Sequence, residues 1–488
     1  MSYNEPLAAT DSMFTVELLN RLLFQMKNGK AAGLDNITCE HLKYSHPILI
    51  TILCKLFNVF MVNGRVPTDF GKSYTVPIPK GNVTRQALTA ENFRGISISP
   101  TISKLFEHAV LVRFSRYFAT SEYQFGFKKQ LSCRHAIYCV RNVIEHYVNN
   151  SSTVNVCSLD LSKAFDRMNH YVLFIKLMDR KLPNELLSLL EHWFSISVTC
   201  VRWGSCYSHF FSLLAGVRQG GVLSPLLFAI FIDSLVDKVR STGVGCYLSY
   251  LCVSIFLYAD DILLIAPSVS ALQTLLHVCE EELRLLDMQL NIHKSVCIRF
   301  GARFKAPCKS LASSFGGVVD WNNSCRYLGV FFVSGHTFKC CFDHAKSQFF
   351  RAFNAILSKI GRFASEEVVI SLMYAKCIPV LLYGTEACHI LARDKRSIEF
   401  TVTRSLMKLF KTSSAIIIED CQKFFHLLPV TYLIDIRMAK FLENFVTNEN
   451  CVCKLFARNA QCSLDKIFLS HGDDIISSCS FITDMFFK

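Results

Sequence analysis

The hydrophobic positions along the chain follow two different spacings. Residues 14–27 place their leucines and a methionine on one helical face, and the Asn28-Gly29 pair that follows is typical of a helix end. The same spacing predicts helices over 47–62, 101–118, 270–287, 344–361, 365–377, 394–411 and 430–446. Shorter apolar runs rich in Val, Ile, Phe and Tyr predict buried strands between them.

Two adjacent acids interrupt one of these apolar runs. Residues 253–258 and 262–266 read as two strands, and the short polar break between them suits a tight hairpin. That break carries Asp260 and Asp261. Charged side chains are seldom buried unless they are paired or bind a metal, and a hard divalent cation with oxygen ligands would stabilise such a pair. Aspartate is also common in ordinary turns, so both interpretations stay open.

A third acid ends another predicted strand. Residues 154–161 are mostly apolar and finish at Asp160, and residues 162–166 then turn into a helix expected to reach about Arg180. If this strand lies beside the Asp260 hairpin, three carboxylates meet at adjacent strand ends.

Basic and glycine-rich segments surround these acids in the sequence. Residues 74–80 contain two prolines and predict an edge strand, which pairs as a hairpin with residues 92–98. One base lies on each arm, Lys80 and Arg94. Residues 216–225 form a glycine-rich turn before a helix over 226–239, where backbone amides can approach a ligand. Each feature alone is equally typical of a solvated surface.

Two other segments allow more than one interpretation. Residues 123–129 mix aromatic and basic side chains, which suits nucleic-acid stacking and phosphate contact, although core packing explains the aromatics equally well. Residues 325–331 predict one more strand.

Composition narrows the class of protein. The 488 residues carry 52 Lys and Arg against 39 Asp and Glu, a net charge of +13 that fits a polyanionic partner or a membrane surface. Hydrophobic residues make up 51%, as in a packed globular protein. The 22 cysteines form no C-x-x-C pair and no secretory signal is visible, which favours free thiols inside the cell. The longest apolar stretch, 248–267, contains both acids, so we expect no membrane span.

The motifs occur in the order of a known family. The chain resembles the reverse transcriptases of non-LTR (LINE-type) retrotransposons, which are related to those of group II introns and to telomerase. The resemblance covers residues 15–410, and the matching segments are KAAGLD (30–35), YTVPIPK (74–80), NFRGISI (92–98), QFGFK (124–128), LDLSKAFD (159–166), GVRQGGVLSP (216–225), YADD (258–261), LNIHK (290–294) and YLGV (327–330).

The resemblance implies a fold and a reaction. The expected fold is an α+β right-hand polymerase, with fingers and palm sharing an antiparallel sheet flanked by helices, followed by a helical thumb. The implied regions are an N-terminal helical extension of the fingers at 1–65, fingers and palm at 66–335, a thumb at 336–425 and a helical tail at 426–488. The reaction is attack of a primer 3′-hydroxyl on the α-phosphate of a dNTP, with two Mg²⁺ ions, or Mn²⁺ as a substitute, held by Asp160, Asp260 and Asp261.

The resemblance also assigns further roles. Lys80 and Arg94 would bind the triphosphate and Gln219 the nucleotide, while Phe165 would exclude a 2′-hydroxyl. Lys294 would donate a proton to pyrophosphate. The implied partners are an RNA template, a DNA primer or target and dNTPs, in the cytoplasm and nucleus. Asp166 begins the helix after Asp160, so we expect it to act as a helix cap or as a partner of the helix dipole rather than as a metal ligand. Tyr258 and Ala259 would help to place the primer end.

Leu34, Gly95, Arg218 and Gly221 stand where other residues are frequent in the family, but they remove no catalytic carboxylate, so they are not expected to inactivate the protein. The endonuclease of full-length relatives is not found, and this supports an alternative. The tail carries Cys451, Cys453, Cys462 and His471 at a spacing that fits zinc poorly. A truncated or domesticated remnant that only binds RNA is therefore the alternative to an active polymerase. An RNA-templated RNA polymerase is disfavoured, because the bulky Phe165 opposes a 2′-hydroxyl.

Overall fold

The computed structural model describes residues 13–80, 89–361 and 363–470, and the chain divides into two compact units. The first unit comprises residues 1–121, 161–237 and 281–289, and the second comprises 122–160, 238–280 and 290–488. The chain leaves the second unit directly after Asp160, and it crosses again inside helices α11 (Ser234–Ser241) and α12 (Val269–Leu285). Each unit is therefore assembled from three separate segments.

A mixed sheet and its covering helices form the first unit. The sheet has the order β2-β1-β4-β5, with β6 also paired to β4. Phe14, Phe57, Phe106 and Trp193 form part of an aromatic core between the helices. The strands are β1 (Lys72–Pro79), β2 (Phe93–Ile98), β4 (Val198–Trp203), β5 (Cys206–Tyr207) and β6 (Phe211–Ser212). The helices are α1 (Val16–Gln25), α2 (Cys39–Lys43), α3 (Ile48–Asn63), α4 (Thr68–Gly71), α5 (Thr101–Arg113), α7 (Ala164–Arg167), α8 (His170–Asp179), α9 (Asn184–Ser195) and α10 (Ser224–Ile232), with 3₁₀ turns at Ala90–Asn92 and Ser115–Phe118.

Strand β1 differs from its prediction. The hairpin with β2 is present, and Arg94 lies opposite Ile78. The prediction of an edge strand is wrong, because Lys72–Thr75 also pair in parallel with Val198–Val201 of β4. The prolines lie beyond this second partner, at positions where the missing proline N–H costs no ladder bond to β4.

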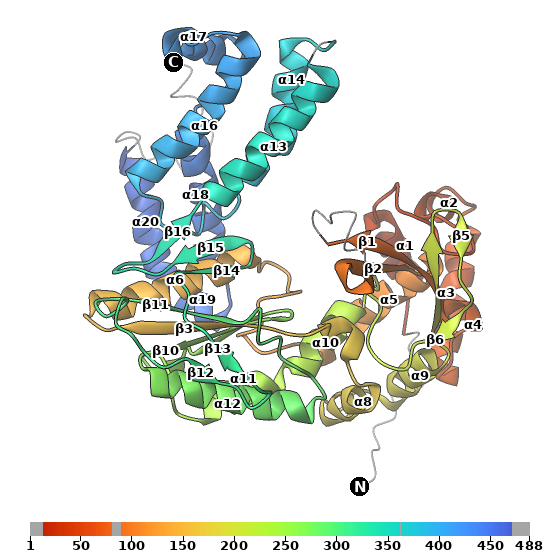
Figure 1. Cartoon of the computed structure of the whole chain (residues 1–488). Coiled ribbons are helices and arrows are strands. Elements are labelled where there is room, and N and C mark those ends of the chain that lie inside the picture. The colour runs from red at the N-terminus through yellow and green to blue at the C-terminus, as the bar shows by residue number, and fades with distance from the viewer. Residues whose placement is uncertain (1–12, 81–88, 362, 471–488) are drawn as a thin grey trace. The chain divides into compact units, whose positions relative to one another are not determined.

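A four-stranded antiparallel sheet lies at the centre of the second unit (Figure 1). Its order is β11 (Val296–Phe300), β3 (Val154–Asp160), β10 (Asp261–Ala266) and β9 (Ile255–Tyr258). Helix α6 (Cys133–Asn149) covers one face and α12 the other (Figure 1). Both faces are covered, so residues 262–266 of β10 are all buried, as the continuous apolar run predicted.

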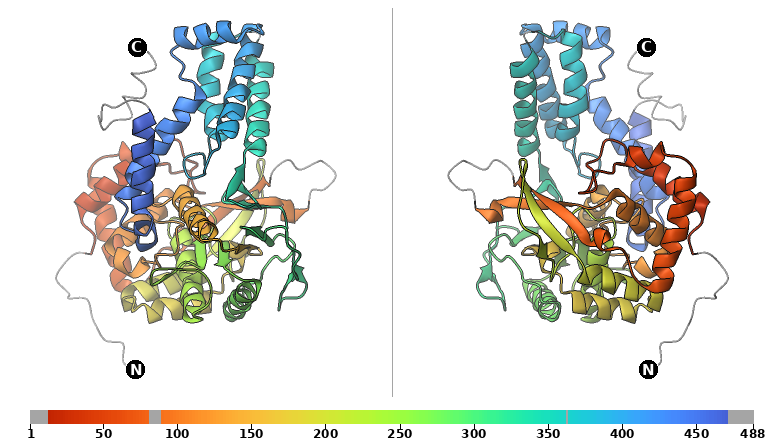
Figure 2. Two further views of the ribbon diagram at one scale, coloured as in Figure 1. Left: turned by 90° about the vertical axis from the view of Figure 1, so that its left-hand side faces the viewer. Right: turned by 90° about the vertical axis from the view of Figure 1, so that its right-hand side faces the viewer.

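The remainder of the second unit is a small sheet followed by helices, which Figure 2 shows from two sides. The strands are β14 (Ser324–Tyr327), β15 (Val330–Val333) and β16 (Lys339–Cys341), with two-stranded pairs β7 (Tyr247–Leu248) with β8 (Leu251–Cys252) and β12 (Leu311–Ala312) with β13 (Val318–Val319). The helices are α13 (Asp343–Ile360), α14 (Glu366–Leu372), a π-helix at Met373–Cys377, α15 (Ile378–Leu381), α16 (Ala392–Phe410), α17 (Ala415–Phe424), α18 (Val430–Val446), α19 (Cys451–Lys454) and α20 (Ala457–Ser470). The predicted α+β class is confirmed. Across the described residues, no helix is long and apolar enough to cross a membrane.

Three predicted elements are divided in the structure. The helix expected over 162–180 is α7 and α8, because Asn169 accepts the N–H groups of Tyr171 and Val172 and begins a new helix. The helix expected over 226–239 begins at Ser224 and is interrupted at Asp233, whose carboxylate accepts from the Ser121 N–H and from Arg180. The strand expected over 325–331 is the hairpin β14–β15.

Candidate active site

The Asp260 and Asp261 pair lies at the tip of the β9–β10 hairpin. Tyr258 pairs with Asp261, so Ala259 and Asp260 form a two-residue turn, as predicted. Ala259 has a φ of 57°, a left-handed conformation that is unfavourable for a residue with a Cβ. This turn needs support from its surroundings.

Gln124 supplies that support. Its side-chain oxygen accepts the Ala259 N–H at 3.0 Å and the Gly126 N–H at 2.9 Å, and the residue is fully buried. The 123–126 segment also bonds to β9 through Leu257 in both directions, at 2.8 and 2.9 Å. A Cβ on Gly126 would lie 2.6 Å from the Ala259 nitrogen, so only glycine fits there. The segment that suggested nucleic-acid stacking therefore acts as the platform for the acidic turn.

Core packing also explains the aromatics of that segment. Tyr123 and Phe125 are buried, and Phe125 stacks on Phe256 of β9 at 5.9 Å. Phe127 is 41% exposed and is the aromatic of the segment that solvent reaches.

Asp160 lies directly opposite Asp261 on the neighbouring strand β3. The predicted juxtaposition of the two strand ends is therefore present, with Asp260 next in the chain. Burial, together with the negative charges of Asp260 and Asp160, raises the pKa of Asp261 to about 6, while the positive charge of Arg326 acts in the opposite direction. The three carboxylates are close enough to repel one another.

This donor set fits a hard divalent cation. All three side chains offer carboxylate oxygens, the ligands that Mg²⁺ and Mn²⁺ prefer. A bound cation would relieve the charge repulsion that, after burial, contributes to the raised pKa of Asp261. Within the described ranges, no group of three or more Asp, Glu, His or Cys side chains is already arranged to hold a metal ion. The metal-binding roles of Asp160, Asp260 and Asp261 therefore stay predictions.

A turn between α12 and β11 brings Lys294 to Asp160. The Asn291 N–H donates to the Asp160 carbonyl at 2.8 Å, and the Asp160 N–H donates to the Ser295 hydroxyl at 3.2 Å. The turn is thus attached to the end of β3. The Lys294 ammonium lies 3.7 Å from the Asp160 carboxylate and is 68% exposed, so it can reach solvent or a ligand beside the acids.

A groove in the second unit opens beside the acidic turn. Tyr258, Asp260 and Asp261 line it together with Arg326, the β14–β15 turn, α13 and Tyr383. Leu328 and Gly329 form that turn with φ values of 45° and 84°. The Tyr383 hydroxyl donates to the Leu328 carbonyl at 2.9 Å, and its ring lies 2.9 Å from where a Gly329 Cβ would stand. Tyr383 therefore fixes the turn of the YLGV segment, and this turn forms one wall of the groove.

In the first unit, the glycine-rich turn is held against Phe165 and β2. The Val217 N–H donates to the Phe165 carbonyl at 2.8 Å, and the Ser97 N–H of β2 donates to the Gln219 carbonyl at 2.8 Å. Cβ atoms on Gly216 and Gly220 would lie 2.6 Å from the Phe165 carbonyl oxygen and 2.4 Å from the Ser97 carbonyl oxygen, respectively, which explains both glycines.

Side-chain hydrogen bonds of Glu107 and Arg218 also stabilise the glycine-rich turn. The buried Glu107 carboxylate accepts the N–H groups of Val222 and Leu223 at 2.6 and 2.7 Å. Arg218 donates to the Phe70 carbonyl at 3.1 Å, to the Gly71 carbonyl and to the Ser197 hydroxyl at 3.0 Å. Arg218, one of the departures from the family pattern, thus ties the turn to α4 and to the segment before β4.

The predicted nucleotide-binding residues all belong to the first unit. Phe165 is half-buried and stacks on Phe228 with ring centroids 4.5 Å apart. The Gln219 side-chain amide donates to Asp166 at 3.0 Å. Asp166 lies in the first turn of α7, the position expected of a helix-dipole partner, and not at the N-cap, which is Lys163. Lys80 follows the end of β1 and donates to the Glu91 carbonyl at 3.0 Å, and Arg94 is exposed on β2.

The cysteines of the tail are separated. Cys453 is buried 3.9 Å from Cys139 of α6, Cys451 is half-buried and Cys462 is exposed on α20. His471 lies outside the described residues.

Several residues of the site were not predicted from the sequence. The motif QFGFK includes Gln124 and Gly126 but indicates no role for either residue, and no motif indicates Glu107, Arg326 or Tyr383. Their partners lie far along the chain, so local patterns carry little signal for them. The Leu-Leu-Tyr-Gly sequence at 381–384, between two predicted helices, was the available indication for Tyr383.

Comparison with known proteins identifies the family of this chain. The family model described as reverse transcriptase (RNA-dependent DNA polymerase) matches residues 78–332, just over half of the chain. The Pol polyprotein of the type-2 retrotransposable element R2DM from Drosophila melanogaster is 25% identical over 383 residues, which cover 77% of this chain and 35% of that protein. The RNA-directed DNA polymerase of the mobile element jockey from Drosophila funebris is 25% identical over 398 residues, which cover 78% and 42%.

The chain spans less than half the length of these two relatives. Among solved structures, apo telomerase from Candida tropicalis is 13% identical with a TM-score of 0.40, covering 91% of this chain and 74% of that one. The resemblance predicted from the ordered motifs is confirmed by the family match.

Proposed function

The chain belongs to the reverse transcriptase (RNA-dependent DNA polymerase) family, and from that premise we propose that it extends a primer 3′-hydroxyl with dNTPs on an RNA template. The observation that carries this proposal is the placement of Asp160 opposite Asp261, with Asp260 in the adjoining turn, at the edge of a buried sheet that opens to a groove. Rigid strands hold such acids more precisely than loops do, which phosphoryl transfer requires.

Reverse transcriptases generally use divalent metal ions, and we assign Mg²⁺ here, two ions, with Mn²⁺ as a substitute. Asp160 and Asp260 would hold them, supported by Asp261. When bound, such ions polarise the phosphate and stabilise the attacking and leaving oxygens.

The protein's own side chains position the substrates. Lys294, exposed beside Asp160, would donate a proton to the departing pyrophosphate. Lys80 and Arg94 would contact the triphosphate, since Arg offers a planar pair of donors to phosphate oxygens. The Phe165 ring, fixed by stacking on Phe228, would exclude a 2′-hydroxyl, and Gln219 would contact the nucleotide from the glycine-rich turn.

The proposed partners follow from the reaction. They are an RNA template, a DNA primer or target and dNTPs, and the net charge of +13 supports binding to a polyanion. We propose that the protein acts in the cytoplasm and nucleus as part of retrotransposition. We also retain the four proposed regions, with boundaries at residues 65/66, 335/336 and 425/426.

The experiment that tests this function is dNTP incorporation on poly(rA)/oligo(dT) with Mg²⁺, beside an Asp260→Asn variant. We expect incorporation that falls by at least about a hundredfold in the variant, because a carboxylate ligand is lost at the reacting centre. An Asp237→Asn variant, which changes the same charge in α11, should keep its activity. Folded protein that binds RNA but incorporates nothing would contradict the polymerase function and favour the RNA-binding remnant.

A further inference from the structure

A polar pocket lies in the second unit where the start of α6 meets the second half of α18. Its wall comes from residues 130–132, Arg134 and His135 on one side and from Lys440, Phe441 and Asn444 on the other. Arg134 and Lys440 bring positive charge to the wall, and among the described residues that line the pocket there is no acid. The pocket therefore has the charge that an anion requires.

A buried donor without an acceptor faces this pocket. His135 is 6% exposed, and its ring is held between Phe445, nearly parallel at 5.6 Å, and the edge of Phe441 at 5.2 Å. The Ser132 N–H donates to Nδ1 at 3.2 Å, which leaves the proton of the neutral ring on Nε2. Burial lowers the pKa of His135 to about 4, so the ring is neutral at pH 7.

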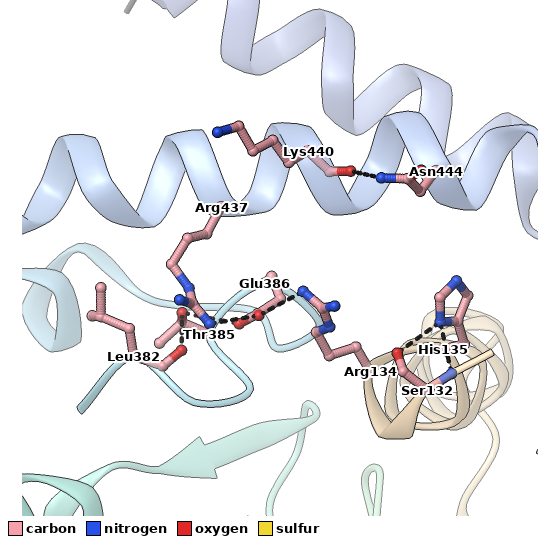
Figure 3. Close-up of polar contacts among 9 residues, drawn as sticks. All are labelled: Ser132, Arg134, His135, Leu382, Thr385, Glu386, Arg437, Lys440 and Asn444. Carbon is pink, nitrogen blue, oxygen red and sulfur yellow. Dashed lines mark hydrogen bonds and ion pairs between the residues drawn. The ribbon is translucent and has the colours of Figure 1, made fainter. Parts of the chain in front are cut away.

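Nε2 of His135 has no hydrogen-bond partner within the part of the chain that the structure describes. Figure 3 shows this nitrogen turned toward α18, where Lys440 and Asn444 lie. A buried N–H group without an acceptor costs about 1–3 kcal/mol, so it marks a place where a ligand oxygen would be favourable.

The positive charge of the wall is only partly neutralised from within. Glu386 is 1% exposed and is bound by Arg134 at 3.1 Å and by Arg437 at 2.9 Å (Figure 3). Two guanidinium groups thus share one carboxylate. The Arg134 side chain is 45% exposed and makes this ion pair through one Nη, so its other N–H groups can serve a ligand. Lys440 is exposed on α18.

We infer that this pocket binds a backbone phosphate of the RNA template, contacted by Arg134, Lys440 and His135. The inference rests on the proposed polymerase function, because it assigns a place to the nucleic acid that the reaction uses. Arg and Lys supply charge to phosphate oxygens, and a neutral N–H adds a directional donor.

The position of the pocket suits a strand that passes the active site. Cys133 lines the groove that contains Asp260 and Asp261, and the next residue, Arg134, lines the phosphate pocket. The first turn of α6 therefore separates the two, and one nucleic-acid strand could contact both.

Two substitutions separate charge from hydrogen bonding. Binding of a labelled single-stranded RNA is measured by fluorescence anisotropy across a KCl series, with EDTA and without dNTPs. Lys440→Gln should weaken binding and reduce the slope of log K against log salt by about 0.7, the value for one phosphate contact on a single strand. His135→Phe keeps the packing between Phe441 and Phe445, and it should weaken binding about fivefold with an unchanged slope.

Lys466→Gln on α20 removes the same charge outside the pocket and should match the wild type. Equal RNA affinities and equal salt slopes for Lys440→Gln and Lys466→Gln would overturn the inference. Because Lys440 is exposed, its substitution should not unfold the protein, so this comparison is valid even if His135→Phe unfolds. Inorganic phosphate that raises the melting temperature of the wild type but not of Lys440→Gln, with RNA binding unchanged, would assign the pocket to a free anion instead.

The assay also separates this inference from the polymerase proposal. It contains no dNTP and no metal, so an inactive protein with a normal Lys440→Gln effect would contradict the polymerase function alone. An active polymerase without that effect would contradict the phosphate pocket alone.

Discussion

Each unit contains a turn in which one buried side-chain oxygen accepts two backbone N–H groups. The oxygen belongs to an amide in one unit and to a carboxylate in the other. In the second unit, the neutral side-chain oxygen of Gln124 accepts two backbone N–H groups and holds the acidic turn. In the first unit, one carboxylate oxygen of Glu107 accepts two N–H groups and holds the glycine-rich turn.

The difference follows from the surrounding charges. A carboxylate at position 124 would add negative charge beside Asp260 and Asp261, where repulsion between carboxylates already contributes to the raised pKa of Asp261. At position 107 the positive charges of Arg218 and Lys104 act against the cost of burying a carboxylate, although burial still raises the pKa of Glu107. A turn that carries acids is therefore held by an amide, and a turn that lies beside a half-buried arginine can be held by an acid.

The largest expected change in the free energy of unfolding comes from removing the Glu107 carboxylate. Glu107→Leu should lower the free energy of unfolding by about 3–5 kcal/mol, because two N–H groups lose their buried acceptor and the desolvated charge of Arg218 loses the favourable electrostatic interaction with the Glu107 carboxylate. Gln124→Leu loses only neutral hydrogen bonds and should cost about 1–3 kcal/mol. Urea unfolding of both variants measures the difference, and equal costs would show that Arg218 does not depend on Glu107.

An intermediate effect is expected from a methyl group beneath the acidic turn. Gly126→Ala should cost about 2–3 kcal/mol and reduce primer extension strongly, since the new Cβ would lie 2.6 Å from the Ala259 nitrogen and displace Asp260. Gly204→Ala, where the Cβ would meet nothing within 4 Å, should cost about 1 kcal/mol, from its positive φ, and keep activity. A Gly126→Ala variant as active as Gly204→Ala would show that the platform does not fix the turn.

The smallest predicted effect is an increase in the free energy of unfolding, whereas the two preceding predictions are decreases. The folded pKa of Asp261, about 6, lies above its ordinary value of 3.8, so ionisation opposes folding, and the protein loses stability as pH rises from 4 through 6. Asp261→Asn removes this cost. The variant should be more stable than the wild type by about 1–2 kcal/mol at pH 8, after allowance for solvent screening, and equal to it below pH 4.

Thermal melting of Asp261→Asn and wild type at pH 4, 6 and 8 without divalent cations checks this prediction. A difference between the two proteins that stays constant over the series would show that Asp261 titrates normally.

Local patterns predicted the elements that carry the acids. The apolar runs before Asp160 and around Asp260 gave the strands β3, β9 and β10, because a sheet covered on both faces leaves a continuous hydrophobic signal. The helices α1 and α3 followed from their 3.6-residue spacing and from the asparagine–glycine pairs after them. The ordered motifs then identified the family.

What local patterns did not predict depends on residues far apart in the chain. The edge assignment of β1 failed because its parallel partner β4 begins at Val198. Gln124 and Glu107 accept hydrogen bonds from backbone N–H groups that lie 135 and 115 residues away in the sequence. A single polar residue in the sequence does not indicate such a distant partner. Residues 325–331 predict one continuous strand because the positive φ of Leu328, which begins the turn, has no sequence signature comparable to Asn-Gly.

The segmented construction of the two units has a consequence for synthesis on the ribosome. The first unit lacks its last segment until Gln289 has been translated, and the second unit needs residues beyond 290 to add β11 to its sheet. N-terminal domains of many proteins fold while the remainder is still being made. Here neither unit can be completed early, so the nascent chain must keep the strands that end in Asp160 and Asp260 from aggregating until more than half of the protein has emerged.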